Sequence, residues 1–166
     1  ALTGHLVLSS LHTNDAPTAI PRMMDMKVAP FLLSAVINAV LAQRLVRRIC
    51  LDCLYSYQVS AEITRVIEQQ FKELDLPKEM QIPKTFFKGK GCQSCNQTGY
   101  RGRMGIFEML QVTDEVRSYI VSPKFTLEEL RQLARKNGMK SMFEDGLTKA
   151  GQGNTTIEEV LRVIRE

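Results

Sequence analysis

Two pairs of cysteines constrain the fold of this chain more than any other feature. Cys50 and Cys53 form one Cys-x₂-Cys pair, Cys92 and Cys95 form a second, and the two pairs use all 4 cysteines of the sequence. Two-residue spacing lets both thiolates of a pair reach the same ion at about 2.3 Å, and two such pairs complete a tetrahedron. The pattern predicts a closed, structural zinc site, because four thiolates leave no open position for water or substrate.

Two other roles for these cysteines stay open on the sequence alone. Two disulfides would use the same residues, but disulfides are rare in the reducing cytoplasm, where we expect this chain to reside. A redox dithiol needs a single Cys-x-x-Cys in a thioredoxin-like setting, whereas this chain has two pairs. The 38 residues between the pairs (54 to 91) exceed the usual spacing of small zinc ribbons and predict an inserted lobe closed by the metal.

Composition narrows the class of protein without selecting a function. A chain of 166 residues suits one domain, or a core with a small inserted module. The formal net charge is +4, and four thiolates with one Zn²⁺ would reduce it to about +2. This charge permits contact with nucleotide or an anionic membrane but does not require nucleic acid. The longest uncharged run, residues 28–43, is shorter than the roughly 20 residues of a membrane span, so we expect a buried core helix.

The first third of the chain predicts a strand, a turn and two helices. Residues 6–11 form a short apolar run typical of a buried strand. In the polar turn that follows, Asn14 or Asp15 can cap a helix, and Pro21 should kink that helix or delay its start. A second helix is predicted to begin at Pro30. Its apolar stripe is formed by Leu32, Leu33, Val36, Ile37, Val40, Leu41 and Leu45. Its C-terminal end is basic, with Arg44, Arg47 and Arg48.

The remainder alternates between helix and extended structure. Residues 60–75 predict a charged amphipathic helix, residues 76–85 a connector, and residues 100–112 a strand. After these the chain reads as helical, with three capping-box starts in which a Thr or Ser precedes a Glu by three residues, at Thr126, Ser141 and Thr156.

The sequence has only two histidines, His5 and His12, and they flank the predicted strand. A strand rises about 3.3 Å per residue, so at full extension they would lie roughly 23 Å apart and could not share one metal ion. His12 would end the strand, and α/β proteins place ligands at the C-terminal ends of strands. The alternative is an incidental histidine in a capped turn.

Several segments together resemble the type II secretion and type IV pilus assembly ATPases. The first, TGHLVLSSLHTNDA at residues 3–16, is similar to the His box of that family. The other matching segments are residues 42–48 with the first cysteine pair after them, the second cysteine pair within 91–103, residues 104–108, and the tail from 145 to 160. The resemblance covers essentially the whole chain.

The resemblance implies the fold class α/β, as the C-terminal part of a RecA-like P-loop ATPase domain carrying an inserted four-cysteine zinc module and a C-terminal helical module. The implied boundaries are 1–49 for the ATPase core, 50–103 for the zinc-binding module, and 104–166 for a strand and the helical module. In the family the His box lies near the nucleotide γ-phosphate and couples its state to subunit motion. This implies a catalytic role for His12, then for His5, with Arg44 in support.

The family's phosphate-binding motifs are not in this sequence. No GxxxxGK[ST] P-loop (Walker A) and no acidic Walker B strand occur, and we expect both upstream of Ala1, in a longer protein of which this is a fragment. The fragment alone should therefore not hydrolyse ATP, and ATP and Mg²⁺ would belong to the full-length enzyme. The resemblance also implies a cytoplasmic homo-hexamer at the inner-membrane face, with an inner-membrane platform protein as partner and no nucleic acid.

Two further functions compete with the ATPase interpretation. A zinc-ribbon nucleic-acid-binding module would need a clustered basic face with aromatic side chains for stacking, and near the cysteines the chain offers Phe86, Phe87 and Tyr100. A purely structural or docking module is the other alternative. Retraction motors of the wider family typically lack the zinc cysteines, so the resemblance favours pilus assembly or secretion without choosing between them.

Overall fold

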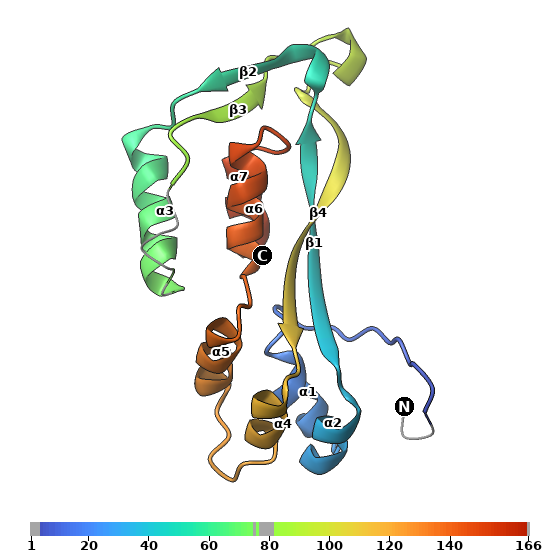
Figure 1. Cartoon of the computed structure of the whole chain (residues 1–166). Coiled ribbons are helices and arrows are strands. Elements are labelled where there is room, and N and C mark those ends of the chain that lie inside the picture. The colour runs from blue at the N-terminus through green and yellow to red at the C-terminus, as the bar shows by residue number, and fades with distance from the viewer. Residues whose placement is uncertain (1–3, 75, 77–81, 166) are drawn as a thin grey trace. The chain divides into compact units, whose positions relative to one another are not determined.

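The computed structural model describes residues 4–74, 76 and 82–165 of the chain (Figure 1). Helices and strands are mixed along the sequence, which confirms the α/β class. The chain divides into two compact units, the first made of residues 1–43 and 107–142 and the second of residues 44–106 and 143–166. In the described part of the chain, every helix is too short or too polar to cross a membrane.

The first unit is built on four short helices. These are α1 (Ala19–Asp25), α2 (Pro30–Val36), α4 (Asp114–Ile120) and α5 (Leu127–Lys136). They bury a small aliphatic core, whose fully buried members are Ala16, Ile20, Leu33, Leu110, Val112, Val116, Ile120, Leu130 and Ala134. The buried members are all aliphatic, and Tyr119 and Phe125 pack against them while partly exposed, so the stability of this core depends on many small apolar contacts.

The second unit holds the inserted lobe and the C-terminal helices. Strands β2 (Leu54–Tyr57) and β3 (Phe86–Gly89) pair antiparallel, and helix α3 (Ala61–Glu73) lies between them in sequence. Helix α6 (Met142–Gly151), apart from its first residue, and helix α7 (Ile157–Arg165) complete the unit. The shared core contains Ile67, Leu76, Phe86, Phe143, Leu147, Ala150, Ile157, Val160 and Leu161, so the lobe and the C-terminal helices bury one another's apolar side chains.

Two long strands, β1 (Ala39–Ile49) and β4 (Tyr100–Gln111), pair with each other and form a two-stranded sheet. The extended structure predicted for residues 100–112 is thereby confirmed. Along β4 alternate residues are buried toward its C-terminal end, at Ile106, Glu108 and Leu110. A carboxylate thus occupies one position of an otherwise apolar row.

The prediction of a single helix from Pro30 to Leu45 is wrong. The helix ends at Val36, and β1 begins three residues later. The run from Val40 to Ile49 fits a period of 2 as well as one of 3.6, and pairing with β4 selects the strand. Leu41 and Leu45, which were expected on the buried stripe, are 61% and 51% exposed. Arg44, Arg47 and Arg48 consequently lie on a strand and not at a helix C-terminus.

The strand predicted for residues 6–11 is also not formed. This segment has no regular secondary structure, and Leu6 and Leu8 are 83% and 88% exposed. A strand needs a neighbouring strand to pair its backbone N–H and C=O groups. Within the described residues the sheets are β1 with β4 and β2 with β3, and neither includes this segment.

Several local predictions are confirmed. Thr126 caps α5, and the hydroxyl of Thr156 accepts the amide of Glu159 at the start of α7. The helix predicted for residues 60–75 forms as α3, Ala61–Glu73. The turn before α1 is held by Asp15, which accepts the amide of Thr18 at 2.8 Å. Pro21 falls in the first turn of α1, because the helix begins only at Ala19. The connector predicted for 76–85 lies partly outside the described residues.

Candidate functional site

The structure brings the four cysteines together. Cys50 follows the last residue of β1, and the next three residues, Leu51–Cys53, form a short 3₁₀ turn that places the second thiol. Cys92 and Cys95 lie on a matching turn whose helical residues are Gln93–Cys95. These two turns stand at one end of the β2/β3 pair, because Leu54 is paired with Gly89 while Tyr57 is paired with Phe86.

The distances among the sulfur atoms fit one metal ion. The Sγ atoms of Cys50 and Cys92 are 3.8 Å apart, those of Cys53 and Cys95 are 4.0 Å apart, and those of Cys92 and Cys95 are 3.7 Å apart. All four lie within 4.8 Å of one another. A tetrahedron with metal–sulfur bonds of about 2.3 Å has edges of about 3.8 Å. All four cysteines are free thiols in this structure and form no disulfide.

Glycine makes the second turn possible. Gly91 and Gly99, which flank the second pair, have φ values of 92° and 75°, a backbone conformation that side chains with a Cβ rarely adopt. A Cβ on Gly99 would lie 2.6 Å from the carbonyl oxygen of Gly89. The amide of Cys50 donates to the carbonyl of Gly99 at 2.9 Å, and this bond joins the two turns.

Backbone amides prepare one thiol for ionisation. Burial acts to raise the pKa of Cys95, but the amides of Cys92 and Gly99 donate to its sulfur at 3.2 and 3.3 Å and lower that pKa to about 6. Burial and the neighbouring thiols raise the pKa of Cys53 to about 11. Without metal, therefore, the thiol of Cys95 can ionise near neutral pH, and a bound cation would favour loss of the Cys53 proton.

A second polar cluster ties the end of β1 to α7. Glu159 is buried, and its carboxylate accepts the backbone amide of Arg47 at 3.1 Å and the guanidinium of the same residue at 2.6 Å. Arg162 adds two bonds to this carboxylate, at 3.1 and 3.2 Å. The guanidinium of Arg47 also lies over the ring of Tyr100, 4.1 Å from its centroid. This cluster lies in the same unit as the cysteines and fixes the strand that leads into Cys50.

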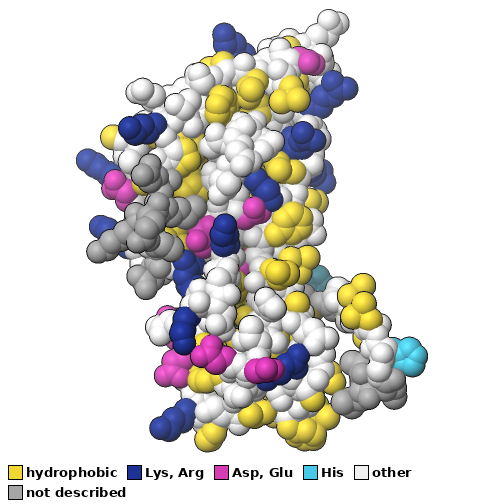
Figure 2. All heavy atoms as spheres, viewed as in Figure 1, with side chains coloured by type: hydrophobic (Ala, Val, Ile, Leu, Met, Phe, Trp, Pro, Cys, Tyr) yellow, Lys and Arg dark blue, Asp and Glu magenta, His cyan; other side chains and the backbone are white. Residues whose placement is uncertain are grey.

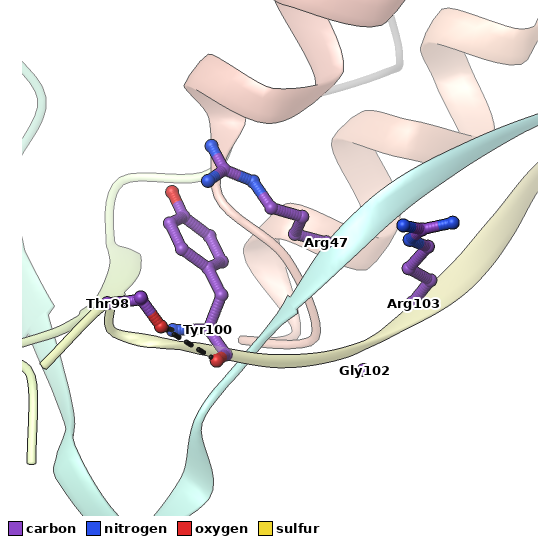
Figure 3. A pocket seen from close by; sticks show the side chains of 5 residues that line it. All are labelled: Arg47, Thr98, Tyr100, Gly102 and Arg103. Carbon is purple, nitrogen blue, oxygen red and sulfur yellow. Dashed lines mark hydrogen bonds between the residues drawn. The ribbon is translucent and has the colours of Figure 1, made fainter. Parts of the chain in front are cut away.

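A shallow pocket of about 250 Å³ opens beside this cluster. Figure 3 shows Arg47 of β1 beside the ring of Tyr100, which lies on β4 together with Arg103. Thr98 and Gly102 complete the lining, and the hydroxyl of Thr98 donates to the carbonyl of Tyr100 at 3.0 Å. Because the carboxylate of Glu159 already engages Arg47, we interpret the pocket as the surface of a structural cluster.

Replacement of Glu159 by Gln should destabilise this unit in a pH-dependent manner. The hydrogen bond from Arg47 is the main cause that lowers the pKa of Glu159 to about 2, below its ordinary value of 4.5. Since the folded pKa is the lower one, the stabilisation is complete above pH 4.5 and is lost as pH falls through about 2. At neutral pH we expect Glu159→Gln to lower the free energy of unfolding by about 1–3 kcal/mol.

Denaturant unfolding of both proteins between pH 2 and 7 measures this difference. Glu158→Gln is a suitable control, because the salt bridge between Glu158 and Lys88 is about one-third exposed on both sides. A stability gap between the wild type and Glu159→Gln that is unchanged from pH 7 down to pH 2 would contradict the assignment.

The predicted catalytic residues are placed as follows. His5 and His12 are exposed and lie in the N-terminal segment, before α1, in the first unit. Histidine side chains are visible at the surface in Figure 2. Arg44 is half-buried on β1 and belongs to the second unit. The roles of these three residues stay predictions.

Sequence reasoning missed one residue of the first unit. Glu108 on β4 is only 6% exposed, and its carboxylate accepts the amide of Ala16 at 2.9 Å and the amide of Met142 at 3.2 Å. Burial raises the pKa of Glu108. Its partners are 92 and 34 residues distant in sequence. The sequence offered one signal for this role. Glu108 stands at a position of the predicted strand where the alternation of buried and exposed residues predicts an apolar side chain.

Fold and site together define an α/β protein with a four-cysteine site, able to hold one metal ion, at the base of an inserted lobe. Residues 1–162 match the family described as Type II/IV secretion system protein. The chain belongs to that family, and the resemblance found in the sequence is confirmed.

Relatives in several bacteria are named as ATPases or as secretion proteins. The chain is 47% identical to the type IV pilus assembly ATPase PilB of Thermus thermophilus, over 97% of this chain and 17% of that protein. It is 43% identical to the type II secretion system protein HxcR of Pseudomonas aeruginosa, over 100% of this chain and 30% of the relative. With the type II secretion system ATPase E of Vibrio cholerae the identity is 41%, over 100% of this chain and 31% of the relative. The chain thus spans between about a sixth and a third of the length of these relatives.

Proposed function

We propose that this chain is the C-terminal part of a hexameric, cytoplasmic ATPase that powers type IV pilus assembly or type II protein secretion. ATP and Mg²⁺ would be bound by a P-loop and an acidic strand outside this sequence, in a RecA-like domain to which the N-terminal segment contributes. A platform protein of the inner membrane would be the partner on which the motor acts. His12 would sense or position the γ-phosphate, with His5 and Arg44 in support.

One observation carries this proposal. The similarity to pilus assembly and secretion ATPases runs through the whole chain, at 41–47% identity, and is not confined to the cysteine pairs. A shared metal-binding motif alone would align only the residues around 50 and 92. The relatives therefore support the activity for the complete protein, and the experiment on His12 given in the Discussion tests it.

A structural zinc ion fits the four-cysteine site. The sulfur–sulfur distances match the edges of a thiolate tetrahedron, and the backbone amides directed at Cys95 stabilise its negative charge. Soft thiolate ligands in this number and geometry favour zinc over the harder divalent cations. We assign Cys50, Cys53, Cys92 and Cys95 as the ligands, in a module that comprises residues 50–103.

The alternative of a nucleic-acid-binding module loses its stacking residues. Phe86 is fully buried in the core of the second unit, Phe87 packs beside Gly153, and Tyr100 lies beneath the guanidinium of Arg47. Figure 2 shows Lys and Arg side chains scattered over the face in view and interspersed with acidic ones. Base stacking needs exposed aromatic faces along a basic groove, so this arrangement favours the motor over the nucleic-acid hypothesis.

The purified chain by itself should hydrolyse ATP no faster than a blank, because residues 1–166 contain no phosphate-binding loop. Phosphate release by the chain, measured beside the full-length protein at equal concentration, checks this. Steady turnover that persists through a further purification step and is unaffected by inhibitors of contaminating ATPases would show that the P-loop argument is mistaken.

A further inference from the structure

Glu108 occupies a place in the first unit that packing alone does not explain. Its neighbours on the same face of β4, Ile106 and Leu110, are fully buried, and Glu108 is 6% exposed. An ionisable carboxyl group at such a position is unfavourable unless hydrogen bonds compensate for its lost hydration. The compensation comes from two backbone amides, those of Ala16 and Met142.

These two amides begin two different segments of the chain. Ala16 opens the turn that leads into α1, and Met142 is the first residue of α6. Amides at the starts of helical segments have no intrahelical acceptor, and they carry partial positive charge. One carboxylate therefore joins the turn before α1 to the start of α6, although residues 16 and 142 are far apart in sequence.

The same turn has a second attachment through Asp15. Its carboxylate accepts the amide of Thr18 at 2.8 Å and forms a salt bridge with Arg131 of α5 at 2.7 Å. The hydroxyl of Thr13 donates to the backbone carbonyl of Asp15 at 3.1 Å. The segment 13–18, whose residues 16–18 form the turn before α1, is thus tied to α5 through Asp15 and to the amide of Met142 through Glu108, and His12 directly precedes it.

We propose that Glu108 is a positioning residue for His12, holding the segment of residues 13–18 against β4, α5 and the amide of Met142. The inference rests on the proposed function, because it assumes that His12 acts on ATP in the full-length enzyme. Glu108 does not touch the nucleotide in this account. It fixes the segment that follows the histidine through the amides of Ala16 and Met142, and the Asp15–Arg131 pair holds the same segment to α5.

The test is a mutant cycle in the full-length enzyme with Glu108→Gln, His12→Ala and the double variant. A glutamine has one oxygen to accept a single amide, and its NH₂ group faces the other amide, so one attachment of the turn is lost. Displacement of a catalytic group by about 1 Å can reduce turnover by about 10²-fold. We expect kcat of Glu108→Gln to fall at least about tenfold, with the KM and Kd for ATP changed less than about threefold.

The double variant distinguishes positioning from a general loss of structure. If Glu108 acts through His12, adding Glu108→Gln to His12→Ala causes no further fall in kcat. Glu115→Gln is the matched control, because Glu115 lies at the surface of the same unit in an exposed pair with Lys136. It should leave kcat unchanged.

Arg131→Gln provides a second variant that removes the partly exposed salt bridge to Asp15, together with a positive charge that acts on Glu108. It should lower kcat in the same direction but less, and it decides the question if Glu108→Gln does not fold. Unchanged kcat in a folded Glu108→Gln enzyme, or a loss fully additive with that of His12→Ala, would overturn the proposal. A His12→Ala enzyme with normal turnover would instead remove the assigned role of His12, which is a distinguishable failure.

Discussion

Freshly purified protein should contain one zinc ion per chain, and removing that ion should unfold the segment from Cys50 to Cys95. The reason is that the thiol cluster joins the ends of the inserted lobe, while Phe86 of β3 anchors the lobe in the core of the second unit. Structural zinc contributes apparent free energies of about 10–16 kcal/mol in small peptides. That is as large as the whole stability of a typical domain, about 5–15 kcal/mol, so the expected effect exceeds that of any single side-chain contact described here.

Metal analysis and hydrogen exchange together measure this effect. A strong chelator, or the variant Cys95→Ser, should abolish the exchange protection of β2 and β3 and lower Tm, whereas Ser94→Ala, an exposed position between the two thiols of the second pair, should do neither. Zinc content well below one per chain, in protein whose melting temperature a chelator does not affect, would refute the assignment. Zinc that stays bound after Cys95→Ser with unchanged stability would refute the ligand set.

In the full-length enzyme, replacing His12 by Ala should lower kcat about 10²-fold or more, the scale of a positioned polar or acid–base group. The Kd for ATP should change much less, because in the proposed enzyme most of the affinity comes from a phosphate-binding loop that residues 1–166 do not contain. Folding should be preserved, since His12 is exposed and precedes the turn that Asp15 stabilises.

Turnover, nucleotide affinity and Tm of the same preparation separate this role from an incidental one. Glu115→Gln is again the control, because Glu115 lies at the surface of the same unit and outside the segment that holds His12. It should leave all three quantities near the wild-type values. If His12→Ala hydrolyses ATP at the wild-type rate, His5 and Arg44 become the next candidates.

Local features of this fold were predictable from the sequence, and tertiary ones were not. The cysteine cluster follows from spacing, because two-residue turns restrict where the thiols can point. Helix α3 follows from its apolar periodicity. Both predictions use residues that are close together in the chain.

The failures share a different cause. The residues of β1 fit both helical and strand periodicity, and only pairing with β4, some 60 residues later, decides between them. The segment 6–11 has the composition of a strand but lacks a partner within the described residues. The partners of Glu108 and Glu159 were not predicted because they are distant in sequence, by 92 residues for Ala16 and 112 for Arg47. A carboxylate alone does not reveal which amide it will accept.

The hydrogen bond between the amide of Cys50 and the carbonyl of Gly99 has a consequence for how the architecture tolerates deletion. The chain enters and leaves the inserted lobe at this one point, between β1 and β4, so residues 51–98 could be replaced by a short hairpin loop with little change in chain-closure entropy. Such a shortened protein would nevertheless uncover Phe143 and Leu147 of α6, which the lobe covers with Ile67 and Phe86. A natural variant without the inserted lobe should therefore carry polar side chains at positions 143 and 147, or cover these two side chains with another surface.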